Sequence, residues 1–268
     1  MQATETHAED LALMLDASRR AADIAMSHFR KDPEVWYKNG GRSPVSEADI
    51  AIDRLLRELL LAARPDYGWL SEEAVDTPDR LAHGRVFIVD PIDGTRAYVS
   101  GRPDWCVSIG LVENGKPVAG VLAAPARGEL WHASAGGGAF RNEVRLIQGH
   151  GENADAPLRV AVPDSVANAM RPGAEASLEK LPGGPSLALR IAAVAQGSLD
   201  GVFVRPRSSE WDLVAADMML RETGHVLVDQ AGVRMVYNAP DPSRGLLLAA
   251  SLEQASWLLA LLQPSDGH

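Results

Sequence analysis

The sequence predicts a mixed α/β (α+β) fold with two subdomains, from three observations. Residues 11–60 carry two amphipathic helical segments, and residues 67–140 carry short apolar strands joined by turns, which is typical of helices packed on an antiparallel sheet. From residue 158 onward, apolar strands alternate with helical segments, which is typical of an α/β arrangement. The polar stretch 141–157 separates the two patterns, so we expect an N-terminal subdomain at 1–145 and a C-terminal subdomain at 146–268.

Two helices open the N-terminal subdomain. Apolar residues recur at helical spacing over 11–29, and a following proline predicts that this helix ends near Lys31. The composition of 40–44 predicts a loop. Ser46 then begins a second helix as its N-cap, with Asp49 three residues further on, as in a capping box.

Apolar runs and turn signals predict the strands. Asn114-Gly115 is the strongest short-range hairpin signal and separates two such runs. The run 86–89 is expected to end at Pro91, which has no N–H for a sheet ladder, and 76–84 is expected to be a polar surface loop. The N-terminal strands are expected at 67–70, 86–89, 105–112, 117–124, 129–133 and 139–140. In the C-terminal subdomain we expect strands at 158–162, 201–205, 225–229 and 245–250, and helices at 186–196, 212–223 and 252–262.

The composition is that of an ordinary soluble globular protein. Of the 268 residues, 46% are hydrophobic and 23% are charged, and the net charge of −10 argues against a nucleic-acid polymer as partner, because that would need a basic face. We expect no membrane span, which takes about 20 apolar residues, and no signal peptide, because residues 1–10 lack an apolar core. The single Cys106 cannot form an internal disulfide, which favours a cytoplasmic location.

The candidate active site begins with Asp90-Pro91-Ile92-Asp93-Gly94-Thr95, at the end of the expected strand 86–89. Two carboxylates three residues apart supply the oxygen ligands that Mg²⁺ prefers, with room for water and phosphate. The alternative is that both aspartates only stabilise a turn. Their position after an apolar strand favours the metal site.

Three further acidic positions are ambiguous when taken singly. Glu72-Glu73 follows an expected strand, where acidic pairs are usually solvated. Asp49 and Asp212 each lie near an expected helix N-terminus, where a carboxylate is favourable without any catalytic role. Together with the two aspartates of the motif, these residues would form a cluster able to bind two or three cations.

Four motifs in one order resemble the motif set of the inositol monophosphatase superfamily of Mg²⁺-dependent, Li⁺-sensitive phosphomonoesterases. They are Ser43–Asp49, Ser71-Glu72-Glu73, Asp90–Thr95 and Trp211–Ala216, and the match spans about residues 7–262. Ser46 stands where the family often has Thr and keeps the hydroxyl. The resemblance implies a layered αβαβα sandwich of the sugar-phosphatase type, with the active site between two subdomains. It also implies two or three Mg²⁺ ions, with Mn²⁺ as an alternative metal and with Li⁺ or Ca²⁺ as inhibitors.

The resemblance further implies a role for each matching residue. The expected metal ligands are Glu72, Asp90, the main-chain carbonyl of Ile92, Asp93 and Asp212. The expected catalytic residues are Asp49, Glu72 and Thr95, with Asp49 orienting the Thr95 hydroxyl, and with Thr95 and Glu72 activating a metal-bound water. Glu73 is the register alternative to Glu72. Substrate contacts are expected from Asp93, Gly94, Thr95, Asp212 and Arg190, with the N–H groups of Gly94 and Thr95 holding the phosphate. Because a bound metal lowers the pKa of water, no catalytic histidine is needed.

The substrate is expected to be a small phosphorylated metabolite. Residues 93–105 most resemble bacterial 3'(2'),5'-bisphosphate nucleotidases, which convert adenosine 3',5'-bisphosphate to AMP and phosphate. A second phosphate needs a second anion site, for which Arg190, Arg205 and Arg207 are candidates, although surface or interface positions are an equal alternative.

Other interpretations stay open. Trp105 and Trp131 are candidates for stacking a base, against the alternative of core packing. The same motifs fit a phosphatase for inositol 1-phosphate, histidinol phosphate or another sugar phosphate. In a different class, the chain would be a non-catalytic metal-binding regulatory protein. Monomer and homodimer are both compatible with the sequence.

Overall fold

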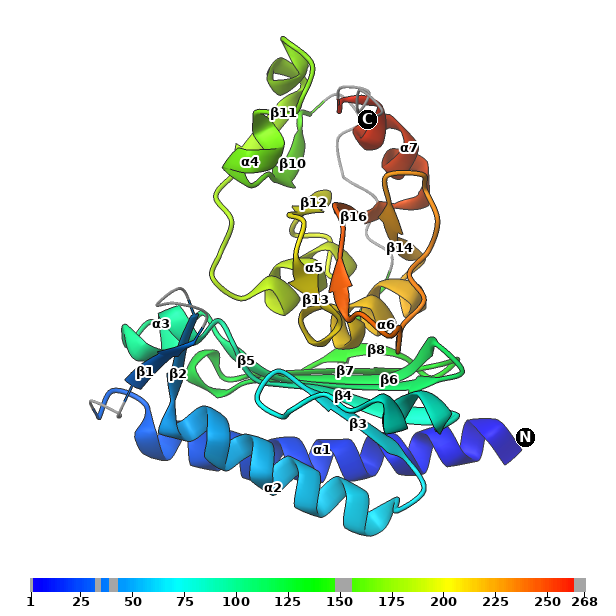
Figure 1. The fold of residues 1–268 in the computed structure, drawn as a ribbon. Helices are drawn as coiled ribbons and strands as arrows, with labels where there is room; N and C mark the ends of the chain where they lie inside the picture. Colours follow the sequence, from blue (N-terminus) through cyan, green and yellow to red (C-terminus); the bar gives the residue numbers. More distant parts are fainter. Residues whose placement is uncertain (1, 32–34, 39–42, 148–155, 263–268) are drawn as a thin grey trace.

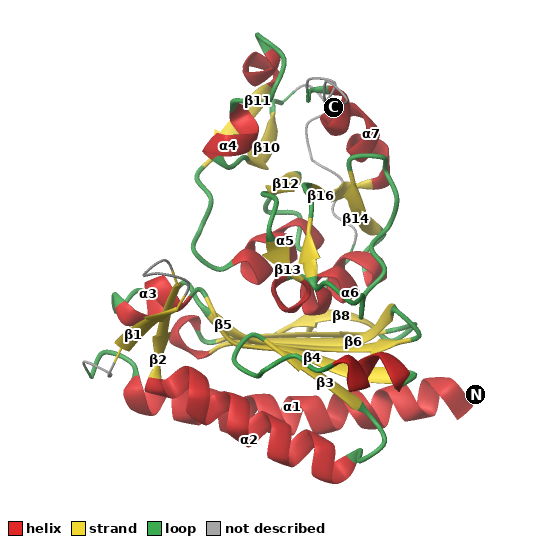
Figure 2. Cartoon of the chain, viewed as in Figure 1, coloured by secondary structure: helices red, strands yellow, loops and turns green. Residues whose placement is uncertain are grey.

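The structure is a computed structural model that describes residues 2–31, 35–38, 43–147 and 156–262. Helices α1 (Gln2–His28) and α2 (Glu47–Ala63) cover one face of a seven-stranded sheet (Figure 1). Helices α5 (Leu187–Ala195) and α6 (Val214–Glu222) lie between this sheet and a five-stranded sheet (Figure 2). Helices α4 (Asp164–Ala167) and α7 (Leu252–Ala260) pack on the other side of the five-stranded sheet. The predicted layered αβαβα sandwich is confirmed.

The seven-stranded sheet has the spatial order β3-β4-β5-β6-β7-β8-β9, with β3 parallel to β4 and all later neighbours antiparallel. Its strands are β3 (Gly68–Ser71), β4 (Arg85–Asp93), β5 (Cys106–Glu113), β6 (Lys116–Ala124), β7 (Glu129–Ser134), β8 (Gly138–Arg141) and β9 (Val144–Arg145). Asn114 and Gly115 form the β5–β6 turn with positive φ angles of 49° and 78°, as the hairpin signal predicted. Short 3₁₀ turns η1 (Pro78–Ala82) and η2 (Pro125–Arg127) lie in the connections.

Two expectations for the N-terminal half are wrong, on the end of β4 and on part of the loop 40–44. Strand β4 does not stop at Pro91 but continues to Asp93, because the ladder to β5 is irregular between Asp90 and Asp93 and so needs no donor from the proline. The segment 76–84 is mostly exposed, as predicted, and contains the 3₁₀ turn η1, in which Arg80 is 3% exposed. Part of the predicted loop 40–44 is strand: β2 (Ser43–Ser46) pairs with β1 (Val35–Lys38), while residues 40–42 lie outside the described residues.

The five-stranded sheet has the order β11-β10-β12-β16-β14 and mixes parallel and antiparallel pairs. Its strands are β10 (Leu158–Ala161), β11 (Leu178–Leu181), β12 (Gly201–Val204), β14 (His225–Asp229) and β16 (Leu247–Ser251). The short elements η3 (Ala174–Ser177), β13 (Ser208–Ser209), η4 (Glu210–Asp212) and β15 (Ser243–Arg244) complete this half. Strand β11 was not predicted, because its sequence Leu-Glu-Lys-Leu has little apolar character. The subdomain bounds 1–145 and 146–268 stay a prediction.

Two glycines of the seven-stranded sheet bring α6 close to the sheet backbone. A Cβ at Gly110 would lie 2.3 Å from Val214 Cγ1, and one at Gly120 would lie 2.5 Å from the carbonyl oxygen of Ala215. Both sites therefore require glycine for the observed packing. Because Asp212 lies two residues before the start of α6, this close approach helps to set how near Asp212 comes to β4 and β5.

Candidate active site

Asp90 and Asp93 lie at the irregular end of β4. Asp90 is 1% exposed and Asp93 is 5% exposed. The Asp90 Oδ1 atom accepts a hydrogen bond from the N–H of Ile92 at 3.0 Å, which fixes the carboxylate beside the irregular segment. Asp90 and Asp93 keep their ladder partners Ser108 and Cys106 in β5, and the two residues between them leave the register.

Asp93 contacts the start of α5. Its oxygens accept hydrogen bonds from the hydroxyl of Ser186 at 2.5 Å and from the N–H groups of Leu187 at 3.2 Å and Ala188 at 2.7 Å. A carboxylate at a helix N-terminus satisfies donors that have no partner within the helix. Ser186 was expected only as the start of the helix 186–196, although a serine directly before an apolar helix is a recognisable N-cap signal.

Gly94 and Thr95 turn the chain after the strand. Gly94 has φ of +97°, and an added Cβ would lie 2.9 Å from the carbonyl oxygen of Asp104, so a larger residue does not fit. The Thr95 hydroxyl donates to the carbonyl of Ile92 at 3.0 Å and lies 3.5 Å from Asp49 Oδ1.

Asp49 is held from the other side by the N-cap of α2. Its Oδ2 atom accepts from the Ser46 N–H at 2.9 Å and from the Ser46 hydroxyl at 2.6 Å, which confirms the predicted capping box. Oδ1 is left to face Thr95. The structure thus brings Asp49 and Thr95 together across 46 residues of sequence.

Asp212 reaches the same place from the C-terminal half. Its Oδ2 atom accepts the N–H of Ser209 at 2.7 Å, and the Ser108 hydroxyl of β5 donates to the carbonyl of Trp211 at 3.2 Å. One carboxylate oxygen from each of Asp90, Asp93 and Asp212 lies within 4.8 Å of the others. Three segments of the chain therefore converge on one acidic cluster.

The negative charge of the acidic cluster is not balanced by positive side chains around it. Burial raises the pKa of Asp90 well above its usual range, and the charges of Glu72, Asp93 and Asp212 raise it further. Burial, with the charge of Asp93 next, raises the pKa of Asp212 to about 7. Burial raises the pKa of Asp93 in the same direction, although its hydrogen bonds to α5 oppose this. Hard oxygen donors whose negative charge is unbalanced fit a divalent cation such as Mg²⁺.

The two glutamates after β3 face different neighbours. The Glu72 N–H donates to the carbonyl of Val89 at 3.2 Å, which places Glu72 beside β4. Its charge is the largest charge effect on the pKa of Asp90, whereas the charge of Glu73 raises the pKa of Asp49. This arrangement favours Glu72, rather than Glu73, as the glutamate that contacts the Asp90 site.

Arg190 lies on α5 near the acidic cluster. Burial lowers the pKa of its guanidinium, the charges of Asp93 and Asp212 oppose this, and nearby Arg205 adds a second positive charge. Arg205 and Arg207 are exposed. Of the three candidate arginines, Arg190 is thus the half-buried one, and the other two lie at the surface.

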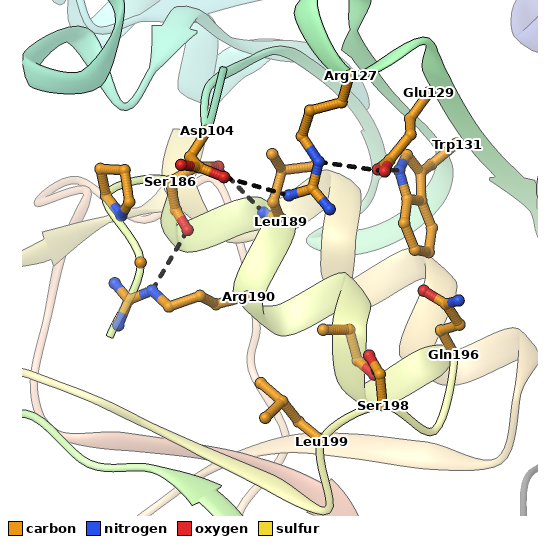
Figure 3. A pocket seen from close by; sticks show the side chains of 13 residues that line it. Asp104, Arg127, Glu129, Trp131, Ser186, Leu189, Arg190, Gln196, Ser198 and Leu199 are labelled. Carbon is orange, nitrogen blue, oxygen red and sulfur yellow. Dashed lines mark hydrogen bonds and ion pairs between the residues drawn. The ribbon is translucent and has the colours of Figure 1, made fainter. Parts of the chain in front are cut away.

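A pocket of about 150 Å³ lies beside the start of α5 (Figure 3). Ser186 and Arg190 line one side, and Arg127 of η2 and Trp131 of β7 line another. Trp105 and Trp131 are 0% and 2% exposed, so both pack in the core, which favours core packing over base stacking.

The chain belongs to the inositol monophosphatase family, whose family model matches residues 7–265. Members of this family are Mg²⁺-dependent phosphatases that hydrolyse phosphomonoesters, which confirms the predicted enzyme class. An inositol-1-monophosphatase of Rhizobium meliloti is 34% identical over 70% of this chain and 73% of its own length. The 3'(2'),5'-bisphosphate nucleotidase CysQ of Aggregatibacter actinomycetemcomitans is 28% identical over 84% of this chain and 86% of its own. The solved structure of a Thermotoga maritima IMPase has a TM-score of 0.81 and 26% identity, covering 94% of this chain and 96% of that chain.

Among the residues that the structure describes, none of the helices combines the length and the apolar character that a membrane crossing needs.

Proposed function

We propose that the protein is a phosphatase for small metabolites with two phosphate groups, with adenosine 3',5'-bisphosphate as the best candidate. The observation that carries the proposal is the half-buried position of Arg190 on α5, where its Nε atom donates to the carbonyl of Ser186 at 3.3 Å and the Ser186 hydroxyl donates to Asp93 at 2.5 Å. A guanidinium next to a phosphate-hydrolysing site suits a second phosphate, because its geometry matches that of phosphate. The 3'(2'),5'-bisphosphate nucleotidase among the relatives is consistent with this substrate class.

The residues proposed to hold Mg²⁺ are Glu72, Asp90, the carbonyl of Ile92, Asp93 and Asp212. Their fit rests on the oxygen donors of the three aspartates within 4.8 Å and on the raised pKa of Asp90. Bound Mg²⁺, two or three ions with Mn²⁺ as a substitute, would neutralise phosphate charge and make a bound water a stronger nucleophile. Competition by Li⁺ or Ca²⁺ at these carboxylates is part of the proposal.

Thr95, Asp49 and Glu72 are proposed to accept the proton that the attacking water gives up. The Thr95 hydroxyl lies 3.5 Å from Asp49 Oδ1, so a modest approach would let it donate there and accept from water. Burial raises the pKa of Asp49 to about 6, which brings this carboxylate closer to the range useful for a proton acceptor near neutral pH. The N–H groups of Gly94 and Thr95 are proposed to bind the phosphate that is hydrolysed.

A substrate panel at fixed Mg²⁺ tests the proposal. We expect a higher kcat/KM for adenosine 3',5'-bisphosphate than for inositol 1-phosphate or histidinol phosphate. Arg190→Gln should raise KM for the bisphosphate about tenfold and leave KM for inositol 1-phosphate nearly unchanged, because hydrogen bonds to a charged group are worth about 1.5–3 kcal/mol. The reverse substrate ranking would instead support an inositol or sugar-phosphate phosphatase, as named among the relatives.

A cytoplasmic location, and a monomer or homodimer, remain predictions. Cys106 is a buried free thiol and burial raises its pKa, so the thiol is poorly reactive. Size-exclusion chromatography with light scattering would determine the oligomeric state.

A further inference from the structure

Arg80 binds the segment that follows Glu72 and holds it in place. It lies in η1 and is 3% exposed, which is rare for an arginine. Its Nε and Nη2 atoms donate to the two carboxylate oxygens of Asp76 at 2.6 and 2.8 Å. Asp76 follows Glu72 by four residues, so this bidentate ion pair fixes the segment just beyond the expected metal ligand.

The same guanidinium crosses to the C-terminal half. Its Nη1 atom donates to Asn238 Oδ1 at 2.7 Å, and its Nη2 atom donates to the carbonyl of Ala239 at 2.9 Å. Asn238 returns a weaker hydrogen bond from Nδ2 to the carbonyl of Arg80 at 3.4 Å. One planar guanidinium therefore holds two segments that are 158 residues apart.

Glu210 continues this connection toward Asp212. It is fully buried, and its carboxylate accepts from the N–H groups of Asn238 at 2.7 Å and Ala239 at 3.1 Å and from the side chain of Arg244. Glu210 is the first residue of η4, and Asp212 is the last. The hydrogen bonds of Glu210 therefore anchor the short turn that presents Asp212.

We infer that Arg80 is a positioning residue for the metal site. Through Asp76 it sets the loop of Glu72, and through Asn238 and Glu210 it sets the turn of Asp212. Mutation of a group that hydrogen-bonds to and orients a metal ligand commonly lowers metal affinity by about 10- to 100-fold. We expect an effect of this order for Arg80. The inference rests on the proposed metal site and extends it to residues outside the four family motifs.

Metal binding measured without substrate tests this role. We expect Arg80→Gln to weaken Mg²⁺ binding in isothermal titration calorimetry about tenfold or more. Arg80→Lys should weaken it too, because one ammonium group cannot serve Asp76 and the 238–239 segment together. The Mg²⁺ concentration that half-saturates activity should rise by the same factor.

Arg54→Gln is the matched control. Arg54 also pairs with a carboxylate four residues away, at 2.9 Å from Glu58, but its side chain is 80% exposed. Its substitution should leave Mg²⁺ affinity unchanged. If Arg80→Gln lowers only the melting temperature and leaves Mg²⁺ affinity at the wild-type value, Arg80 is merely structural and the inference is overturned.

Asn238→Gly is a second variant, in which Arg80 itself is unchanged, so it tests the same connection without altering the buried arginine. Asn238 has φ of +59°, so glycine keeps its backbone conformation and removes the side chain that accepts from the Arg80 guanidinium and donates weakly to the Arg80 carbonyl. We expect a smaller loss of Mg²⁺ affinity in the same direction, and an unchanged affinity overturns the inference. Absence of Mg²⁺ binding to the wild-type protein would instead refute the proposed function, so the two failures are distinguishable.

Discussion

Replacing Asp93 by Asn removes one negative charge from the acidic cluster with almost no change in volume. The native carboxylate accepts three hydrogen bonds, from Ser186 Oγ at 2.5 Å and from the N–H groups of Leu187 at 3.2 Å and Ala188 at 2.7 Å. Asparagine has one acceptor oxygen, so at least one of these donors loses its partner at a cost of about 1–3 kcal/mol. Relief of repulsion from the neighbouring aspartates offsets part of this cost.

Activity should suffer far more than stability. Charge stabilisation by a bound cation is worth several kcal/mol, and losing about 4 kcal/mol corresponds to about a 10³-fold slower reaction. We therefore expect Asp93→Asn to lower kcat/KM by about 10³-fold or more. The melting temperature should fall by no more than about 10 °C, since about 1 kcal/mol shifts a chain of this size by roughly 2–4 °C.

The assay is phosphate release over a Mg²⁺ titration, paired with calorimetric melting of both proteins. Asp16→Asn is the control, because this carboxylate is 55% exposed and lies 2.9 Å from Arg20 on α1 rather than in the cluster. It should retain activity within about twofold, as exposed ion pairs contribute little. Turnover at the wild-type rate in Asp93→Asn would refute the assignment of Asp93 to the metal site.

Three further predictions address the residues around the cluster. Gly94→Ala should destabilise the protein by about 2 kcal/mol or more in denaturant unfolding, because an added Cβ would lie 2.9 Å from the carbonyl oxygen of Asp104. Thr95→Val should lower kcat about 10²-fold, whereas Thr95→Ser keeps the hydroxyl and most of the activity. Without metal, the melting temperature should rise as pH falls from about 8 to 5.5. The reason is that the pKa of Asp212 is raised from 3.8 to about 7 and that of Asp49 to about 6, so the folded state binds protons that the unfolded state releases. Saturating Mg²⁺ should flatten this dependence, and a metal-free protein that melts lower in acid would contradict the raised pKa values.

Local sequence signals predicted much of the fold. The Asn114-Gly115 turn located the hairpin, and Ser46 with Asp49 located the start of α2. The end of β4 was predicted wrongly, because the rule for proline in a sheet assumes a regular ladder and Pro91 lies in an irregular one. Strand β11 has no periodic apolar pattern to reveal it.

The candidate site was predictable where chemistry lies in contiguous residues. Asp90 and Asp93 could be proposed as a pair from spacing, and the motif order supplied Asp212. The contact of Asp93 with Ser186 spans 93 residues, and that of Arg80 with Asn238 spans 158. Such partners are brought together by the packing of the two halves, which periodicity and spacing in one sequence do not specify.

The glycine contacts beneath α6 have a consequence for how this protein tolerates change. Gly120 lets the main chain of α6 at Ala215 lie against the main chain of β6, and Gly110 leaves room for the Val214 side chain of α6, so no side chain of the sheet determines the separation between helix and sheet at these two points. Elsewhere in the same core, aliphatic side chains can be exchanged or repacked with small local shifts. The two glycines therefore fix the distance between α6 and the sheet, and with it the position of Asp212. The aliphatic side chains in the rest of this core can vary without changing that position.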